Sequence, residues 1–239
     1  MRQIKTKLKR IVLLLTLATA AMACNSTPKA MNFKYKIVGN TDYIPDNTII
    51  ILYNGVFYGE QPNDDQTIAT MTVHNGSFGY EGTAKQPAAA VMYIPSESAY
   101  MPVFIEKGDI QVFFAKDPIN TTVFGTPLND SIQMLALKNI ECSYKAQREM
   151  QKFQNPPTAD EQKIIQEISI RFRQEVGNIH YSCALRNINN ELGFFLVISS
   201  QKYFTLEQLA NLLVKLPKQK HDHPIIKELD NLVIENLQK

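Results

Sequence analysis

The hydrophobic pattern of the chain changes its period near residue 128. Before this point, short segments rich in β-branched and aromatic residues alternate with turn signals, as in an antiparallel sandwich or barrel. After it, the apolar residues recur at helical spacing. The pattern predicts an α+β fold, in which an N-terminal antiparallel β-sandwich or barrel-like domain over residues 32–128 is followed by an all-helical region over residues 129–239.

Turn signals divide the first part into eight predicted strands. Asn54–Gly55 precedes Val56–Tyr58, and Asn75–Gly76 precedes Ser77–Tyr80. Because an Asn-Gly pair supplies the two positive φ angles of a type I′ turn, each pair predicts a hairpin, and Lys107–Gly108–Asp109 predicts a third turn. The predicted strands are Phe33–Val38, Thr48–Tyr53, Thr67–Val73, Ser77–Tyr80, Ala88–Tyr93, Met101–Ile105, Ile110–Phe114 and Thr121–Phe124.

Two long amphipathic segments, 130–153 and 159–186, predict an antiparallel helical hairpin that turns at Pro156–Pro157. Cys142 and Cys183 fall on the apolar stripes of these helices. With the turn at the two prolines, the cysteines are offset by roughly 20 Å along the helix axis, at about 1.5 Å per residue. Because a disulfide spans no more than about 7 Å between Cα atoms, we expect two buried free thiols.

Capping boxes mark two of the predicted helix starts. Thr158 with Glu161, and Thr205 with Gln208, have the S/T-x-x-E/Q form in which the cap side chain satisfies a free backbone donor. Asn189–Ser199 is apolar and β-branched, so its composition does not separate helix from strand, and we interpret it as a short helix. Further helices are predicted for Leu206–Leu216 and Pro224–Leu237.

Residues 1–23 have the form of a secretory signal peptide. The basic segment Arg2 to Arg10 leads into 13 uncharged residues ending at Ala23, fewer than the ~20 of a transmembrane helix. Cys24 directly follows Ala21–Met22–Ala23 and resembles the lipobox cysteine of bacterial lipoproteins, which is lipidated and becomes the new N-terminus. Ala21–Met22–Ala23 also has the A-x-A form of an ordinary signal peptidase cleavage site, and cleavage there would leave Cys24 unmodified.

Lipidation of Cys24 would make residues 24–31 a polar tether to a membrane. The tether lacks the acidic run that resembles a surface-export signal in Bacteroidetes lipoproteins. We therefore expect a lipid-anchored protein of the bacterial cell envelope, on the periplasmic face of the outer membrane.

The composition, with 44% apolar and 20% charged residues, is that of an ordinary globular protein. The formal net charge of +2 depends on five basic residues in the leader. Residues 24–239 carry 20 basic and 23 acidic side chains, a net charge of −3. Because nucleic-acid binding requires a clustered basic surface, this balance argues against nucleic acid as a partner.

Two histidines near the C-terminus are the candidate metal ligands. His221 and His223 flank Asp222, and two imidazoles beside a carboxylate suit zinc or copper. Apart from Asp222 and Glu228, the sequence offers no third ligand. A solvated linker that ends where Pro224 opens the last helix explains the same residues, so we predict no metal and no other cofactor.

No catalytic residue is predicted, because the sequence has no Gly-rich phosphate loop, G-x-S-x-G elbow or H-E-x-x-H motif. His180 lies one position off the apolar face of its helix, where a hydrogen-bonded boundary histidine is expected. His74 has no acidic or nucleophilic partner nearby in the sequence. Glu106 and Asp109 flank Gly108 as a candidate carboxylate pair, which a polar surface turn explains equally well.

Two further features are candidates for modification or binding. Asp130-Ser131-Ile132 resembles a short O-glycosylation signal of Bacteroidetes, although helix capping by Asn129 or Asp130 accounts for the same residues. Aromatic residues near the predicted turns are candidates for a binding face, and strand residues of this kind also pack into cores. They are Tyr53, Phe57, Tyr58, Phe78, Tyr80, Tyr93 and Tyr100.

A resemblance to a known family rests on three stretches: Asn75-Gly76-x-Phe78, Val103-Phe104-Ile105-Glu106-x-Gly108-x-Ile110-x-Val112 and Gly125-Thr126-Pro127-x-Asn129-Asp130. Their order resembles the N-terminal domain of unknown function of Bacteroidetes TlpA-like or AhpC/TSA thiol-disulfide interchange lipoproteins. The helical stretch is similar to the segment that follows in those proteins, so the resemblance covers residues 32–237. Its motifs there are Asn190-x-x-Gly193-Phe194-Phe195 and the helix Leu206–Pro217.

In that family a thioredoxin-like domain with a catalytic C-x-x-C follows at about Lys239. Since this chain contains no C-x-x-C, the resemblance carries no redox activity over to it. We expect a non-catalytic, membrane-anchored periplasmic protein, not an enzyme, that acts as a binding or assembly module for a periplasmic protein partner. The alternative is an accessory docking partner of a separately encoded periplasmic thioredoxin-like oxidoreductase.

Overall fold

The structure is a computed structural model that describes residues 32–55, 64–153 and 156–237. Within it, Phe33–Lys239 forms one compact unit. The predictions for the signal peptide, Cys24, the tether and the segment Val56–Tyr58 lie outside the described residues.

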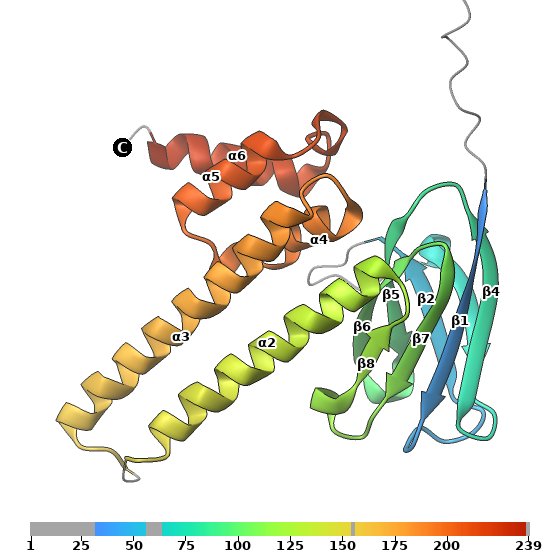
Figure 1. Cartoon of the computed structure of the whole chain (residues 1–239), viewed down its shortest axis with the longest axis horizontal. Coiled ribbons are helices and arrows are strands. Elements are labelled where there is room, and N and C mark those ends of the chain that lie inside the picture. Colours follow the sequence, from blue (N-terminus) through green and yellow to red (C-terminus); the bar gives the residue numbers. More distant parts are fainter. Residues whose placement is uncertain (1–31, 56–63, 154–155, 238–239) are drawn as a thin grey trace, which may run out of the picture. The chain divides into compact units, whose positions relative to one another are not determined.

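Eight strands form two four-stranded sheets, which confirms a β-sandwich followed by helices (Figure 1). The first sheet has the order β4-β1-β7-β8, and the second has the order β3-β2-β5-β6. Nineteen buried residues, including Ile37, Leu52, Met92 and Ile110, form the core cluster of the sandwich. The strands are β1 (Phe33–Thr41), β2 (Ile49–Asn54), β3 (Thr67–Thr72), β4 (Ser77–Ala84), β5 (Ala88–Ile94), β6 (Ala99–Ile105), β7 (Gly108–Phe114) and β8 (Thr122–Phe124).

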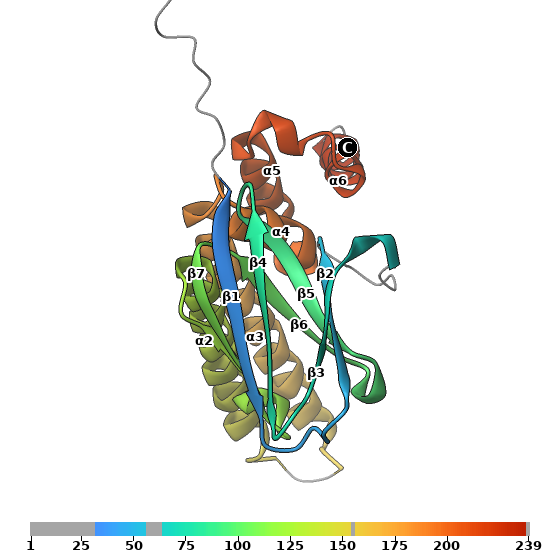
Figure 2. The same ribbon diagram turned by 90° about the vertical axis from the view of Figure 1, so that its right-hand side faces the viewer.

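The sequence predicted antiparallel strands, but the first sheet contains one parallel pair. β1 lies between β4 and β7 (Figure 2), antiparallel to β4 but parallel to β7. Parallel strands need a long crossover, and here the crossover consists of the second sheet and β4. The alternation of apolar and polar residues cannot predict whether two strands are parallel or antiparallel, because side chains alternate with a period of two in both cases.

The Asn75–Gly76 pair forms its predicted turn without the predicted hairpin. Both residues have positive φ, 51° and 69°, and His74 and Ser77 form a single bridge across the turn. Beyond the bridge β3 pairs with β2, and β4 pairs with β1. The chain therefore crosses from one sheet to the other at this turn. The ring of Phe78 lies against the backbone of Gly39. A Cβ at position 39 would be 2.0 Å from this ring, so glycine leaves the room that the ring needs.

The second part is helical, as predicted, and α2 and α3 form the long hairpin of Figure 1. Both predicted capping boxes are present, at α3 and α5. No helix among the described residues is long and apolar enough to cross a membrane. The helices are α2 (Pro127–Met150), α3 (Ala159–Arg186), α4 (Glu191–Ser199), α5 (Leu206–Lys215) and α6 (Pro224–Leu237). Cross-hairpin contacts join Asn139 to His180, Lys145 to Glu175, and Glu149 to Arg171.

The start of α2 fastens the helices to both sheets. Asn129, fully buried, accepts the backbone N–H of Phe104 in β6 at 2.9 Å and donates to its carbonyl at 2.7 Å. One turn later, Gln133 Oε1 accepts the N–H of Val123 in β8 at 3.0 Å. Since β6 and β8 are edge strands of different sheets, α2 closes one open side of the sandwich.

Neither Asn129 nor Asp130 caps α2, contrary to the prediction. Thr126 occupies the N-cap position, in an extended conformation and without a side-chain cap, and Pro127 follows it. Asp130 instead accepts the N–H of Gly125 at 2.8 Å. Gly125 has a φ of 100°, and a Cβ there would lie 2.5 Å from the carbonyl oxygen of Asp109.

Candidate functional site

The two sheets differ in the chemistry of their outer faces. The strands of the first sheet carry Lys34, Lys36, Glu81 and Asp109, and all four of these side chains are exposed. The four strands of the second sheet contain no charged residue. A strand with one face in solvent normally alternates apolar residues, which point into the core, with polar residues, which point to solvent. The lack of charged residues on the outer face therefore makes the second sheet the unusual one.

The outer side chains of β2, β5 and β6 form a largely apolar surface, here named the tyrosine face, and the exposed threonines Thr70 and Thr72 of β3 border it. Tyr93 lies opposite Tyr100 in the β5–β6 register and opposite Ile51 in the β2–β5 register. The rings of Tyr93 and Tyr100 stack, with centroids 4.4 Å apart. Tyr100 and Ile49 are each 48% exposed. The tyrosine face consists of the exposed Ile49 and Tyr100, the half-buried Ile51, Tyr93 and Pro102, and the buried Tyr53 and Val91 at its border.

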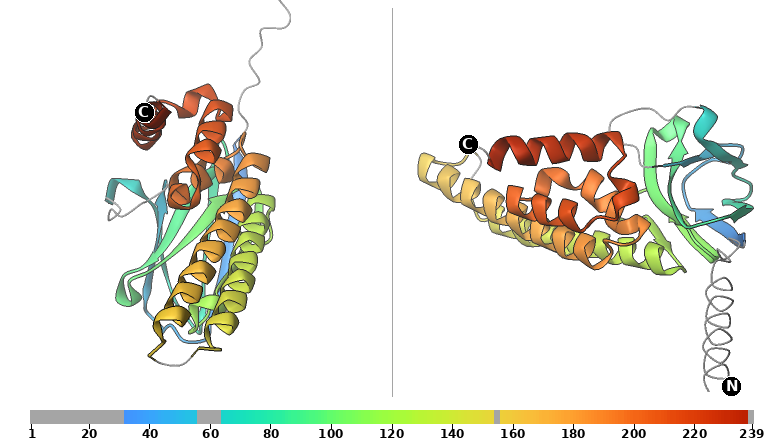
Figure 3. Two further views of the ribbon diagram at one scale, coloured as in Figure 1. Left: turned by 90° about the vertical axis from the view of Figure 1, so that its left-hand side faces the viewer. Right: turned by 90° about the horizontal axis from the view of Figure 1, so that it is seen from above.

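Helices cover only one end of this sheet. Phe104 and Ala89 belong to the helical core cluster, and the ring of Phe104 meets that of Phe195 in α4 edge to face at 5.7 Å. In the left view of Figure 3, the end of β5 and β6 extends clear of the helices. That end carries Tyr93 and Tyr100, so none of the described helices covers this end of the sheet.

The candidate aromatic residues thus separate into groups. Tyr93 and Tyr100 lie on the tyrosine face, and Tyr53 lies at its buried border. Phe78 and Tyr80 point into the sandwich, where the ring of Tyr80 lies 6.0 Å from that of Tyr35. Phe57 and Tyr58 lie outside the described residues.

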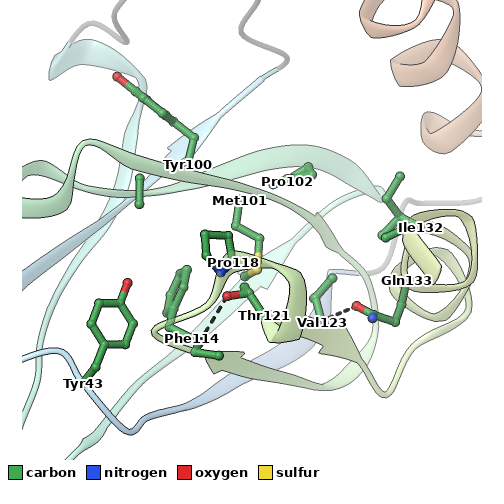
Figure 4. A pocket seen from close by; sticks show the side chains of 13 residues that line it. Tyr43, Tyr100, Met101, Pro102, Phe114, Pro118, Thr121, Val123, Ile132 and Gln133 are labelled. Carbon is green, nitrogen blue, oxygen red and sulfur yellow. Dashed lines mark hydrogen bonds between the residues drawn. The ribbon is translucent and has the colours of Figure 1, made fainter. Parts of the chain in front are cut away.

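A pocket of about 240 Å³ lies beside the tyrosine face, between the edges of β6 and β8 (Figure 4). Phe114, Pro118 and Val123 form part of its wall, and Ile132 and Gln133 of α2 border one end. No charged residue lines it. No local sequence pattern predicts this pocket, because its wall joins residues from 43 to 136 through the closure of the two sheets.

The candidate carboxylate pair does not form a site. Glu106 accepts the backbone N–H of Leu128 at 2.7 Å and so holds the start of α2 against the β6–β7 turn. Asp109 is exposed on the outer face of the first sheet. Together with Asn129 and Asp130, Glu106 shows that the motifs of the family resemblance stabilise the junction of sheets and helix.

His221 and His223 do not converge on a metal site. His221 contacts Asp230 at 3.2 Å and the carbonyl of Leu216 at 3.3 Å. His223 packs edge to face on Phe194, at 5.3 Å between ring centroids. In the described part of the chain, no group of three or more metal-ligating side chains could hold an ion.

His180 is buried rather than at the border of the apolar face of α3, and both ring nitrogens have partners, as expected of a hydrogen-bonded histidine. Nδ1 lies 2.7 Å from the hydroxyl of Ser200, and Nε2 lies 2.8 Å from the side-chain nitrogen of Asn139. Burial lowers the pKa of His180. Ser200 is itself only 3% exposed, and through His180 the three side chains connect α2, α3 and the end of α4.

Cys142 and Cys183 are free and buried, as predicted. Burial is the largest cause that raises the pKa of each thiol. The predicted offset of 20 Å is wrong, because the cross-hairpin contacts place Cys142 level with about residue 178. The axial offset from Cys183 is therefore about five residues, or roughly 8 Å. The error arose because the two helices were assumed to start level at the prolines, whereas the contacts place the end of α2 beside about residue 170, so the first turns of α3 extend past the end of α2.

A comparison with family models matches one region of the chain, the sandwich with the start of α2. A search of curated proteins gave no match to the chain. The matched region runs from β1 through both sheets to the second turn of α2, and so contains Asn129 and the residues of the tyrosine face. Residues 35–132 match the family described as a domain of unknown function, DUF4369.

Proposed function

We propose that this protein is a non-catalytic binding module that holds a protein partner on the tyrosine face. The observation that carries the proposal is the contrast between the two sheets: one is charged on its outer side, and the other is uncharged with stacked tyrosines. Exposed apolar surface of this kind marks interaction sites in soluble proteins. Tyrosine is enriched at such sites because it buries a large area with few rotatable bonds.

The proposal includes a location in the cell envelope, through lipidation at Cys24. This part of the proposal rests on the signal-peptide form of residues 1–23 and on Cys24, which follows them. In its second form, the partner is a separately encoded thioredoxin-like oxidoreductase, which the resemblance to TlpA-like lipoproteins favours. Because Cys142 and Cys183 are both buried, the reactive dithiol would then belong to the partner.

Photo-crosslinking in the native cell envelope tests the binding face. A photoreactive phenylalanine analogue replaces Tyr100 or, as a matched control, Tyr144 of α2, which is 47% exposed against 48% for Tyr100. We expect a discrete protein adduct from position 100 and none from position 144.

A second substitution links the adduct to the face. Ile49→Glu places a charge among the apolar residues and is expected to remove the adduct. Phe124→Glu, at a residue 46% exposed in β8 of the other sheet, is expected to leave it. Equal adducts from positions 100 and 144, or an adduct that survives Ile49→Glu, would contradict the proposal.

A further inference from the structure

The open edge of β6 joins the tyrosine face to the pocket. In Figure 4 the ring of Tyr100 points away from the pocket, while the strand segment Ala99–Pro102 lines it. A partner that covers the tyrosine face at Tyr100 therefore reaches the pocket mouth within one or two residues. The inference below rests on the proposed function and specifies the partner.

The direction of the backbone groups along β6 follows from Asn129. The N–H of Phe104 donates to Asn129, and the carbonyl of Phe104 accepts from it. Both backbone groups of Phe104 therefore point away from β5. The N–H and carbonyl groups of successive residues point to opposite sides of a strand. The backbone groups of Pro102 and Tyr100, two and four residues before Phe104, therefore also point away from β5. Proline has no N–H to offer. The outward edge thus presents the N–H and carbonyl of Tyr100 and the carbonyl of Pro102, a short template for one or two main-chain hydrogen bonds.

The pocket itself favours a neutral apolar group. The backbone N–H groups of Ala115 and Val123 are already bonded, to Thr121 at 3.2 Å and to Gln133 at 3.0 Å. No charged side chain lines the cavity, and an apolar cavity gives water few partners. Its volume of about 240 Å³ is below the ~300–1,000 Å³ of pockets for drug-sized ligands, so it suits a single large side chain.

The wall favours an aromatic side chain over an aliphatic one. Figure 4 shows the rings of Tyr43, Phe114 and Pro118 on one side of the pocket, with Met101 beside them. Edge-to-face and offset contacts between aromatic rings stabilise such packing beyond area burial, and methionine sulfur makes favourable contacts with rings.

We propose that an extended segment of a partner protein pairs with the edge of β6 at Tyr100 and inserts one aromatic side chain into the pocket between β6 and β8. This is strand addition to a sheet edge, shortened by Pro102 and Asn129. The few main-chain bonds set the direction of the segment, and the pocket selects the anchor residue.

Titration of the full chain with short peptides tests the site, with the methyl resonances of Met101 and Ile132 as the readout. The probes are acetyl-Ala-Phe-Ala-amide, the corresponding leucine peptide, and toluene, which is the phenylalanine side chain without a main chain. We expect saturable shifts with the phenylalanine peptide, and at least tenfold weaker binding of the other two probes.

Ala136→Phe fills the pocket mouth from the exposed surface of α2 and should weaken peptide binding at least tenfold. Ala159→Phe, at another exposed helical alanine, should leave binding unchanged. If Ala136→Phe disturbs folding, Ala136→Glu places a charge at the same mouth and makes the same test.

Several outcomes would overturn the inference. They are the absence of saturable shifts at Met101 and Ile132, and binding that persists in the Ala136 variants. Equal affinity for the leucine peptide would overturn the aromatic anchor, and equal affinity for toluene would overturn the main-chain pairing. Each of these results, combined with a specific adduct from position 100, overturns the corresponding part of the inference and leaves the proposed function standing.

Discussion

The side-chain amide of Asn129 pairs with the backbone of Phe104 as a neighbouring β-strand would, accepting the N–H and donating to the carbonyl. A second donor hydrogen bond joins the same amide to the Thr126 hydroxyl at 2.7 Å. The residue is fully buried. A helix residue thus completes the edge of a sheet, and the sandwich depends on α2 for its closure.

We predict that Asn129→Ala lowers the free energy of unfolding by about 2–6 kcal/mol, because it leaves a buried N–H and carbonyl without partners at about 1–3 kcal/mol each. Urea unfolding measures the change. Gln133→Ala, at a half-buried residue with one such bond, is expected to cost less. Asn236→Ala, at an exposed residue of α6, serves as the neutral control, and an effect of Asn129→Ala no larger than that of Asn236→Ala would contradict the assignment.

Stability is predicted to fall as the pH drops below about 6.5. Burial lowers the pKa of His180 from its ordinary value of 6.5, and burial and Lys220 lower the pKa of His223. The unfolded state therefore binds protons more readily than the folded state. The stabilisation is complete above pH 6.5 and is lost as the pH falls toward the folded-state pKa values.

Unfolding curves between pH 7 and pH 5 measure this dependence. Each histidine contributes a slope of up to ~1.4 kcal/mol per pH unit. His180→Gln should be less stable than the parent at pH 7 but should show a shallower slope. His74→Asn, at an exposed histidine, should keep the parent slope. A slope that His180→Gln does not reduce would show that His180 is not buried in its neutral form.

Cys142 and Cys183 are predicted to react with a thiol reagent only after denaturation, because the thiolate is the reactive form and burial raises both thiol pKa values. Mass spectrometry of a Cys24→Ser chain, alkylated before and after unfolding, gives the number of accessible thiols. Modification of either residue in the folded protein, or a trapped disulfide between them, would contradict the burial of these thiols.

Cys24→Ala is predicted to move the protein from the membrane fraction to the soluble periplasmic fraction. A diacylglycerol thioether together with an N-acyl chain gives firm attachment, whereas a single acyl chain gives only marginal binding. Mass spectrometry of the mature N-terminus identifies the modification. An unmodified Cys24, or membrane association that persists in the variant, would contradict lipid anchoring.

The sequence predicted the elements of the fold well, because each depends on local pattern. Among the described residues, the eight strands and five α-helices lie close to the ranges that period, capping boxes and turn residues predicted. The partners of the strands could not be predicted in the same way. Asn75–Gly76 fixes two φ angles, but whether the strands beside it pair with each other depends on which sheet buries each of them.

The candidate site was predicted only in part. Tyr93 and Tyr100 were identified as aromatic strand residues, but their exposure depends on where α4 ends on the sheet. Asn129 was interpreted as a helix cap, because its partner Phe104 is 25 residues away and belongs to an edge that is defined only after the sandwich has formed. Long-range contacts of this kind have no signature in a local window of sequence.

The central position of β1 has a mechanical consequence. Tension applied at residue 32 enters the fold directly through β1, which is held by eight register pairs with β4 and seven with β7. An edge strand can be peeled away one hydrogen bond after another, whereas a strand in the middle of a sheet is pulled against two ladders at once. A protein anchored through its N-terminus would therefore bear load on one of its most firmly held strands, and a partner on the second sheet would be carried without strain on its own binding surface.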